Sequence, residues 1–127
     1  ELPAGEVVVL QPYGSLFFAS APLFEAALPA VEASSRNSVV ILRLRGTTEL
    51  GGTFTNVVRR YAEALQAVGS KLVIVSVNDR VLEQLTTTRV LDVVRHDDVY
   101  IGDEWVGRTV RRAHDDALAW IEANRQS

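Results

Sequence analysis

Apolar residues along the chain are spaced with two periods, one typical of strands and one typical of helices. Short apolar runs, too short to span a membrane, predict strands buried in a sheet. These runs are residues 7–10, 39–42, 72–75 and 99–101. A further run at residues 15–19 follows the turn Pro12-Tyr13-Gly14. It predicts a strand that pairs with the first as an antiparallel hairpin at the edge of the sheet.

Longer segments between these strands carry apolar residues three and four positions apart, which predicts helices. We expect helices from Ser20 to about residue 28, from the Gly51-Gly52-Thr53 turn to Gly69, from a cap at Asn78 or Asp79 to residues 86–88, and from about residue 106 to residue 121. The buried stripe of the last helix is predicted to be Val106, Val110, Ala113, Ala117, Trp120 and Ile121. Residues 90–94 are expected to return to the core as a turn of helix. The order is therefore β-β-α-β-α-β-α-β-α, with about five strands and four helices. This order predicts an α/β fold with a central, mostly parallel sheet covered by helices.

Composition narrows the classes of function. The 127 residues fit a single domain, and the formal net charge of -3 gives no broad basic field for nucleic acid. The absence of cysteine removes disulfides, thiolate nucleophiles and cysteine-based zinc sites. No apolar stretch approaches the ~20 residues of a transmembrane helix. Because the chain has no methionine and starts at Glu1, we expect a fragment or a processed product.

The Gly51-Gly52-Thr53 turn is the main candidate for a binding site. It would place free backbone N–H groups at a helix N-terminus, where anions and phosphate groups are favoured. The alternative is that the two glycines only allow a tight turn and a close approach to neighbours. Arg43 and Arg45 follow the central strand, at the sheet edge where open α/β folds bind ligands. Both are therefore candidates for contact with an anion or a partner.

The remaining polar residues do not form a catalytic or metal constellation. His96 and His114 have no metal-ligand spacing with another ligand type, and the serines lack a G-x-S-x-G context. The last helix carries Arg108, Arg111 and Arg112, which could meet an acidic partner or lipid. Acidic residues four positions after the last two favour a solvated face with intrahelical pairs. We expect no enzyme activity, no metal and no cofactor.

At this point the chain resembles the STAS family, named for sulfate transporters and anti-sigma factor antagonists. Residues 15–21, SLFFASA, are similar to the second strand typical of STAS domains on SulP-type anion permeases. Residues 39–58 and 72–91 resemble the family's central strand–loop–helix and the strand and short helix that follow. The resemblance covers nearly the whole chain. It implies the STAS-like, anti-sigma factor antagonist-like fold, with residues 1–127 as one STAS domain.

Two positions depart from the family's pattern. Gly52 stands where the antagonist branch has its phosphate-accepting serine, so phosphorylation at that position is chemically impossible. Thr53, one residue later, is the remaining candidate acceptor. Arg89 corresponds to the glycine usual after the third helix, which argues against a left-handed turn there.

The resemblance implies a regulatory and interaction domain of a bacterial SulP-type (sulfate) permease, cut from the cytoplasmic C-terminus of a larger membrane protein. Its partners would be the membrane domain of the same transporter, a second copy in a homodimer, and a small anion or nucleotide as ligand. The implied contact residues are Arg45, Thr47, Thr48, Gly51, Gly52 and Thr53. The alternative is a soluble anti-sigma factor antagonist-like protein in a partner-switching pathway, which would bind a kinase. A small α/β enzyme is disfavoured because no nucleophile–base pair appears.

Overall fold

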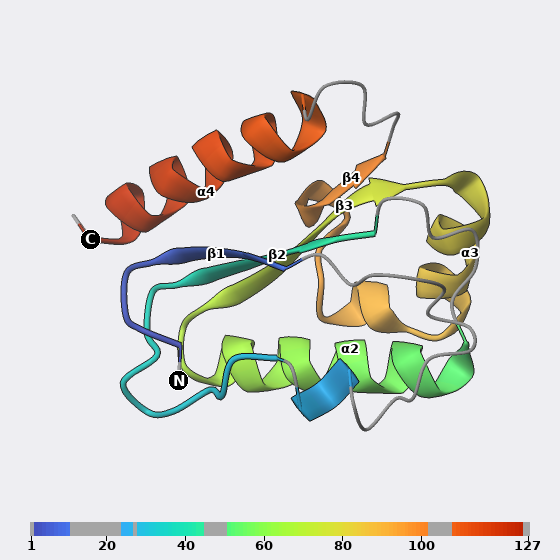
Figure 1. The fold of residues 1–127 in the computed structure, drawn as a ribbon, viewed down its shortest axis with the longest axis horizontal. Coiled ribbons are helices and arrows are strands. Elements are labelled where there is room, and N and C mark those ends of the chain that lie inside the picture. Colours follow the sequence, from blue (N-terminus) through green and yellow to red (C-terminus); the bar gives the residue numbers. More distant parts are fainter. Residues whose placement is uncertain (1, 11–23, 27, 45–50, 102–107, 126–127) are drawn as a thin grey trace.

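The computed structural model describes residues 2–10, 24–26, 28–44, 51–101 and 108–125, and the statements below concern these residues (Figure 1). The predicted hairpin strand at residues 15–19 lies outside this part of the chain. So do residues 45–50 of the predicted contact loop.

A sheet of four parallel strands forms the centre of the described fold. The strands are β1 (Val7–Leu10), β2 (Val39–Arg43), β3 (Lys71–Val77) and β4 (Val99–Ile101), and they lie in that order. All four were predicted from their apolar runs. Each β2 residue from 39 to 42 is at most 1% exposed, because a strand with helices on both faces must be apolar at every position.

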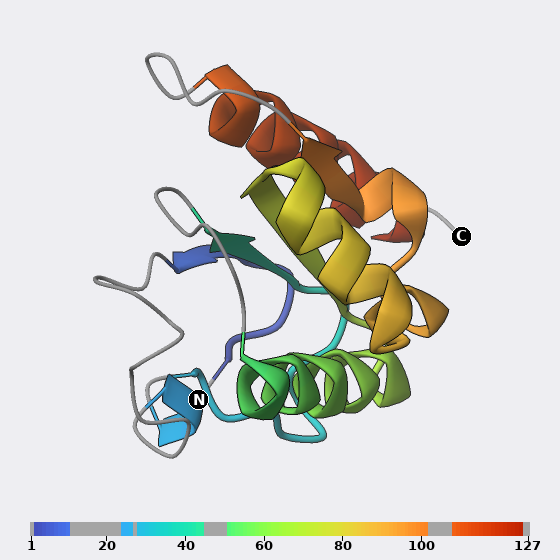
Figure 2. The same cartoon turned by 90° about the vertical axis from the view of Figure 1, so that its right-hand side faces the viewer.

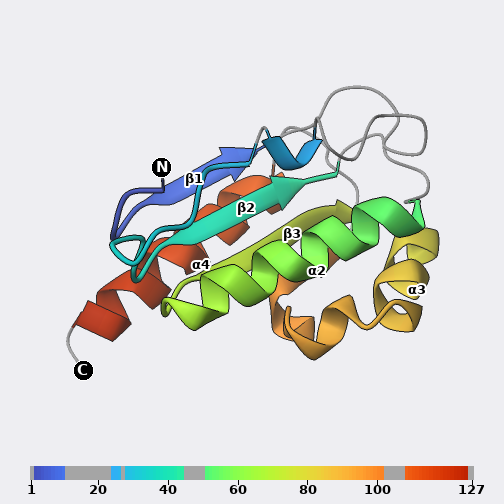
Figure 3. The ribbon, with the colours of Figure 1, turned by 90° about the horizontal axis from the view of Figure 1, so that it is seen from below.

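Helices cover both faces of this sheet (Figures 1 and 2). Helices α2 (Gly52–Ala67) and α3 (Asp79–Thr87) lie on one face, and α4 (Arg108–Arg125) lies on the other. Figure 3, seen from the α2 side, shows α2 running along β2 and β3. Parallel strands need long crossover connections, and α2 and α3 lie in the connections from β2 to β3 and from β3 to β4. Helix α4 follows β4, the last strand.

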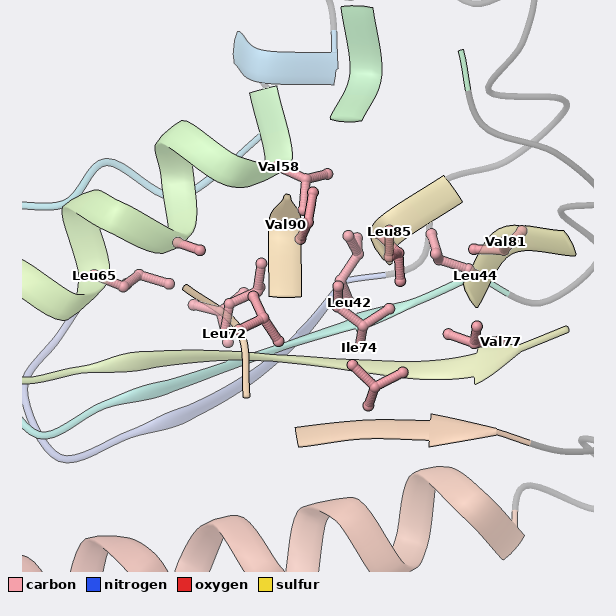
Figure 4. Packing of buried hydrophobic residues seen from close by; sticks show 14 of the residues in the cluster. Leu42, Leu44, Val58, Leu65, Leu72, Ile74, Val77, Val81, Leu85 and Val90 are labelled. Carbon is pink, nitrogen blue, oxygen red and sulfur yellow. The ribbon is translucent and has the colours of Figure 1, made fainter. Parts of the chain in front are cut away.

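Two apolar clusters follow from this arrangement. The larger one lies between the sheet and helices α2 and α3, and Figure 4 shows its centre around Leu42, Ile74 and Leu85. The smaller one lies between the sheet and α4, which contributes Ala113, Ala117 and Ile121. These three residues belong to the stripe predicted for the last helix, and the partly buried Val110 and Trp120 pack against the same cluster.

The ends of α2 and α3 agree with the sequence signals. Gly69 follows the last residues of α2 with a φ of 76°, as expected for a helix-ending glycine. Asn78 caps α3, since its side-chain Oδ1 accepts a hydrogen bond from the Val81 N–H at 2.7 Å. Of the two predicted caps, Asn78 rather than Asp79 is therefore correct.

The turn after α3 differs from the prediction. Arg89 adopts a left-handed conformation with φ 66° and ψ 21°, although a glycine is usual for such a turn. The chain reverses here so that Val90, 0% exposed, enters the core as the start of a short 3₁₀ helix (Val90–Asp92). Burial of Val90 thus imposes a backbone conformation that the arginine itself disfavours. A second 3₁₀ helix (His96–Asp98), which was not predicted, leads into β4.

Candidate docking edge at the start of helix α2

The carboxyl ends of the strands share one edge of the sheet with the first turns of α2 and α3 (Figure 1). Strand β2 ends at Arg43, and Leu44 prolongs its pairing by donating from its N–H to the Val75 carbonyl at 3.1 Å. Leu44 is 2% exposed, so the chain stays anchored in the core up to this residue. The next described residue, Gly51, is the N-cap of α2.

The first turn of α2 has no side-chain cap and no acidic residue. Gly51 is extended, with φ -78° and ψ 154°, and its carbonyl accepts the first helical hydrogen bond from the Thr55 N–H at 3.1 Å. Gly52 and Thr53 are exposed. The backbone N–H groups of an uncapped first turn need partners and attract negative charge. This turn can therefore receive an acidic or phosphate group.

Residues just behind this turn hold it in place. Phe54 is 2% exposed, and its ring packs against that of Phe24 with centroids 5.2 Å apart. Thr55 is buried, and its hydroxyl donates to the Gly52 carbonyl at 2.8 Å. The exposed pair Gly52 and Thr53 therefore stands on a packed base.

Neither glycine of the turn is required by the backbone. A Cβ at Gly52 would meet no atom within 4 Å, and one at Gly51 would lie 4.0 Å from a ring carbon of Phe54. Neither residue has a positive φ. The described residues therefore give no sign that these glycines serve a tight turn or a close approach, and they leave room for a Cβ at either position.

The other predicted site residues are only partly brought together. Gly51, Gly52 and Thr53 lie at this edge, and Arg43 is half-buried at the end of β2. Arg45, Thr47 and Thr48 lie outside the described residues.

The charges on α4 lie away from this edge and contact β4. The Arg112 guanidinium lies 5.2 Å from the ring centre of Tyr100, and the Tyr100 hydroxyl donates to the Asp116 carboxylate at 2.6 Å. Burial, followed by this hydrogen bond and the charge of Asp116, raises the pKa of Tyr100. Tyr100 therefore stays protonated and attaches α4 to β4, and Asp116 is engaged with Tyr100.

The two histidines lie on different elements. His96 is exposed in the second 3₁₀ helix, and His114 is half-buried on α4. Within the described ranges, no group of three or more histidine, aspartate or glutamate side chains could hold a metal ion. No helix of the described residues is long and apolar enough to cross a membrane.

Sequence reasoning missed two polar features at the opposite, amino edge of the sheet. One is a hollow of about 510 Å³ beside Lys71, whose Nζ lies 2.9 Å from Asp98 Oδ1 and 4.8 Å from the Trp120 ring centre. The other is a group of three buried serines, Ser35, Ser38 and Ser70. The sole lysine of the chain was a signal for the first, whereas the serines carry no motif.

Comparison with known proteins gives a family and two solved structures. The family model described as STAS domain matches residues 4–113. A sulfate transporter family protein from Wolinella succinogenes superimposes with a TM-score of 0.72 at 21% identity, covering 96% of this chain and 92% of that one. The STAS domain of a SulP transporter from Vibrio cholerae superimposes with a TM-score of 0.66 at 26% identity, covering 97% and 88%. The comparison with curated proteins gives no match.

Proposed function

The chain belongs to the STAS domain family, and we propose that it is a non-catalytic, cytoplasmic regulatory domain of a SulP-type anion permease. One observation carries the proposal. The chain is similar over 97% of its length to the STAS domain of the Vibrio cholerae SulP transporter. The matches indicate no enzyme family. Integration into a membrane protein and a homodimer of the whole transporter are part of the proposal.

The domain would act by contact through the carboxyl edge of its sheet. The uncapped first turn of α2 offers backbone N–H groups and two exposed residues, Gly52 and Thr53, on a packed base. A partner that places a carboxylate or phosphate here would gain hydrogen bonds and a favourable helix dipole. We include Arg45, Thr47 and Thr48 in this contact surface, together with Gly51. Binding of the transporter's membrane domain, or of a small anion or nucleotide, would shift the balance between transporter conformations.

The substitution Gly52→Asp in the full-length transporter tests this proposal. A Cβ at Gly52 would meet no described atom within 4 Å, and a negative charge in the first helical turn is favourable for folding. It would, however, repel an incoming carboxylate or phosphate. We expect anion uptake to fall while the isolated domain keeps its stability.

Gly52→Ala is the matched control because it adds the Cβ without charge. Uptake by this variant should stay close to that of the unmodified transporter. If Gly52→Asp transports as well as Gly52→Ala, the edge is not the contact surface.

A soluble anti-sigma factor antagonist-like protein remains the alternative, because the exposed Thr53 is a residue that a kinase could phosphorylate. Incubation with a cognate kinase and ATP would then label the chain. Thr53→Ala should abolish the label, and Gly52→Ser should add a second acceptor. A label that survives Thr53→Ala removes this alternative, as does recovery of the native polypeptide only in a membrane-bound form much larger than 13.9 kDa.

A further inference from the structure

The amino-terminal strap (residues 2–6) is bound to the fold although it precedes the first strand. Leu2 is 0% exposed and belongs to the larger apolar cluster. Its N–H donates to the Ala30 carbonyl at 2.8 Å, and the Gly5 N–H donates to the Arg36 carbonyl at 3.0 Å. These bonds hold the strap against residues 30–36 before β1 begins. Chain ends are ordinarily loose unless such contacts tie them down.

Two of the three buried serines, Ser35 and Ser38, make further hydrogen bonds to the strap. Ser35 Oγ donates to the Leu2 carbonyl at 2.5 Å, and Ser38 Oγ donates to the Pro3 carbonyl at 2.5 Å. The Glu6 N–H donates to Ser38 Oγ at 3.4 Å. Polar backbone groups at residues 2, 3 and 6 are thus satisfied by side chains of one loop, which is what burial of this segment requires.

The serines are also joined to one another and to the end of α2. Ser70 Oγ donates to the Ser35 carbonyl at 2.5 Å and accepts from the Ser38 N–H at 3.0 Å. The Ser70 N–H donates to the Leu65 carbonyl of α2 at 2.8 Å. Ser35 Oγ also accepts from the Glu32 N–H at 3.0 Å, so each of the three hydroxyls both donates and accepts. A fully satisfied buried network of this kind fixes the geometry of the segments that it joins.

The last turn of α4 reaches the same place. Gly5 has a φ of 68°, and a Cβ there would come within 3.0 Å of Arg125 Nη2. Asn37 Nδ2 donates to the Ile121 carbonyl of α4 at 3.1 Å. In Figures 1 and 3 both ends of the chain lie on the amino side of the strands, opposite the first turn of α2.

We propose that residues 2–6, clamped by Ser35, Ser38 and Ser70, form a rigid coupling segment. A displacement of the chain at Leu2 is then passed to β1, to the end of α2 and to the last turn of α4, because residues 2, 3, 5 and 6 are all hydrogen-bonded to the fold. The rigidity of the segment is independent of the proposed function, but its role rests on it: in a permease, the segment would transmit movement between the membrane domain and the STAS domain. The coupling segment lies at the amino edge of the sheet, so it does not cover Gly52 and Thr53 at the carboxyl edge.

Nuclear magnetic resonance relaxation of the chain tests the rigidity without any substitution. We expect backbone order parameters of about 0.85 for Gly5 and Glu6, as for the residues of β2. Values below about 0.6 at both residues would overturn the proposal, since the strap would then move independently of the sheet.

Hydrogen exchange in Ser38→Ala tests the clamp. The variant removes the donor to Pro3 and the acceptor of Glu6, so the Gly5 and Glu6 amides should exchange about tenfold faster relative to the Ile74 amide. Normalising to Ile74, which is 0% exposed in the core, corrects for any general loss of stability.

Thr53→Ala is the control for removing a hydroxyl, because it deletes an exposed one at the opposite edge. It should leave the ratio of exchange rates unchanged. An unchanged ratio in Ser38→Ala as well would show that the serine does not hold the strap. Both measurements use this chain alone, so their failure is distinct from a failure of the transport test with Gly52→Asp.

Discussion

Replacing Arg89 by glycine should stabilise the domain relative to alanine at the same position. Arg89 has φ 66° and ψ 21°, in the left-handed region, where an L-residue with a Cβ is disfavoured by about 1–2 kcal/mol. Glycine has no Cβ and therefore lacks this strain. Its greater flexibility in the unfolded chain, however, lowers the free energy of unfolding by about 0.5–1 kcal/mol. We expect Arg89→Gly to exceed Arg89→Ala by about 1 kcal/mol in the free energy of unfolding.

Comparing glycine with alanine, rather than with arginine, removes the side chain's own contacts from the measurement. The Arg89 Nε lies 4.0 Å from Asp92 Oδ2, and the two side chains are 78% and 68% exposed. Such a surface pair contributes less than about 0.5 kcal/mol. Both substitutions delete it equally, so their difference reports the backbone conformation.

Arg95 provides a matched control site. It is also an exposed arginine that precedes a 3₁₀ helix, but its backbone is extended, with φ -63° and ψ 150°. Glycine should therefore be less stable than alanine there by about 0.5–1 kcal/mol, through the unfolded state alone. The sign of the glycine–alanine difference should invert between the two positions.

Urea denaturation of the four variants, followed by tryptophan fluorescence and circular dichroism, gives the free energies. The midpoint should change while the slope with denaturant stays constant. If glycine is no better than alanine at position 89, or if both sites show the same sign, the left-handed turn is not a source of strain.

Two further predictions concern the first turn of α2 and the half-buried Tyr61. Gly51→Asp should raise the free energy of unfolding by about 1 kcal/mol, because it supplies the missing cap and a charge that suits the helix dipole. Gly51→Ala is the control. Equal stability of the two variants would contradict the capping argument. Burial raises the pKa of Tyr61 to about 12 from 10.0, so its contribution is complete below pH 10 and is lost as the pH rises toward 12. Stability should therefore fall over this interval, and less so in Tyr61→Phe when followed by circular dichroism; an identical fall in both proteins would rule out Tyr61 as the cause.

The two edges of the sheet have different chemistry in the described structure. The carboxyl edge presents an uncapped helix start with exposed Gly52 and Thr53. The amino edge contains satisfied groups, including the Lys71–Asp98 ion pair at 2.9 Å and the serine network. This difference supports our proposals that a partner contacts the first edge and that the chain is attached at the second.

The sequence by itself determined the elements whose signals are local. The uninterrupted apolar run at residues 39–42 predicted a strand buried on both faces, and spacing predicted which face of α4 meets the sheet. Asn78 before an apolar helix predicted a cap, and its side chain caps α3. These predictions succeed because strand and helix periods and caps depend on residues within a few positions of one another.

Only the tertiary structure decided the features that depend on distant residues. The left-handed Arg89 follows from the burial of Val90, which overrides the arginine's own preference. The serine network joins residues that are more than 30 positions apart in the sequence, such as Ser38 and Ser70. A serine in a polar loop has the same local pattern whether it is solvated or buried. Its role is fixed only when the packing of strand, helix and strap removes water from its hydroxyl and leaves protein groups as its partners.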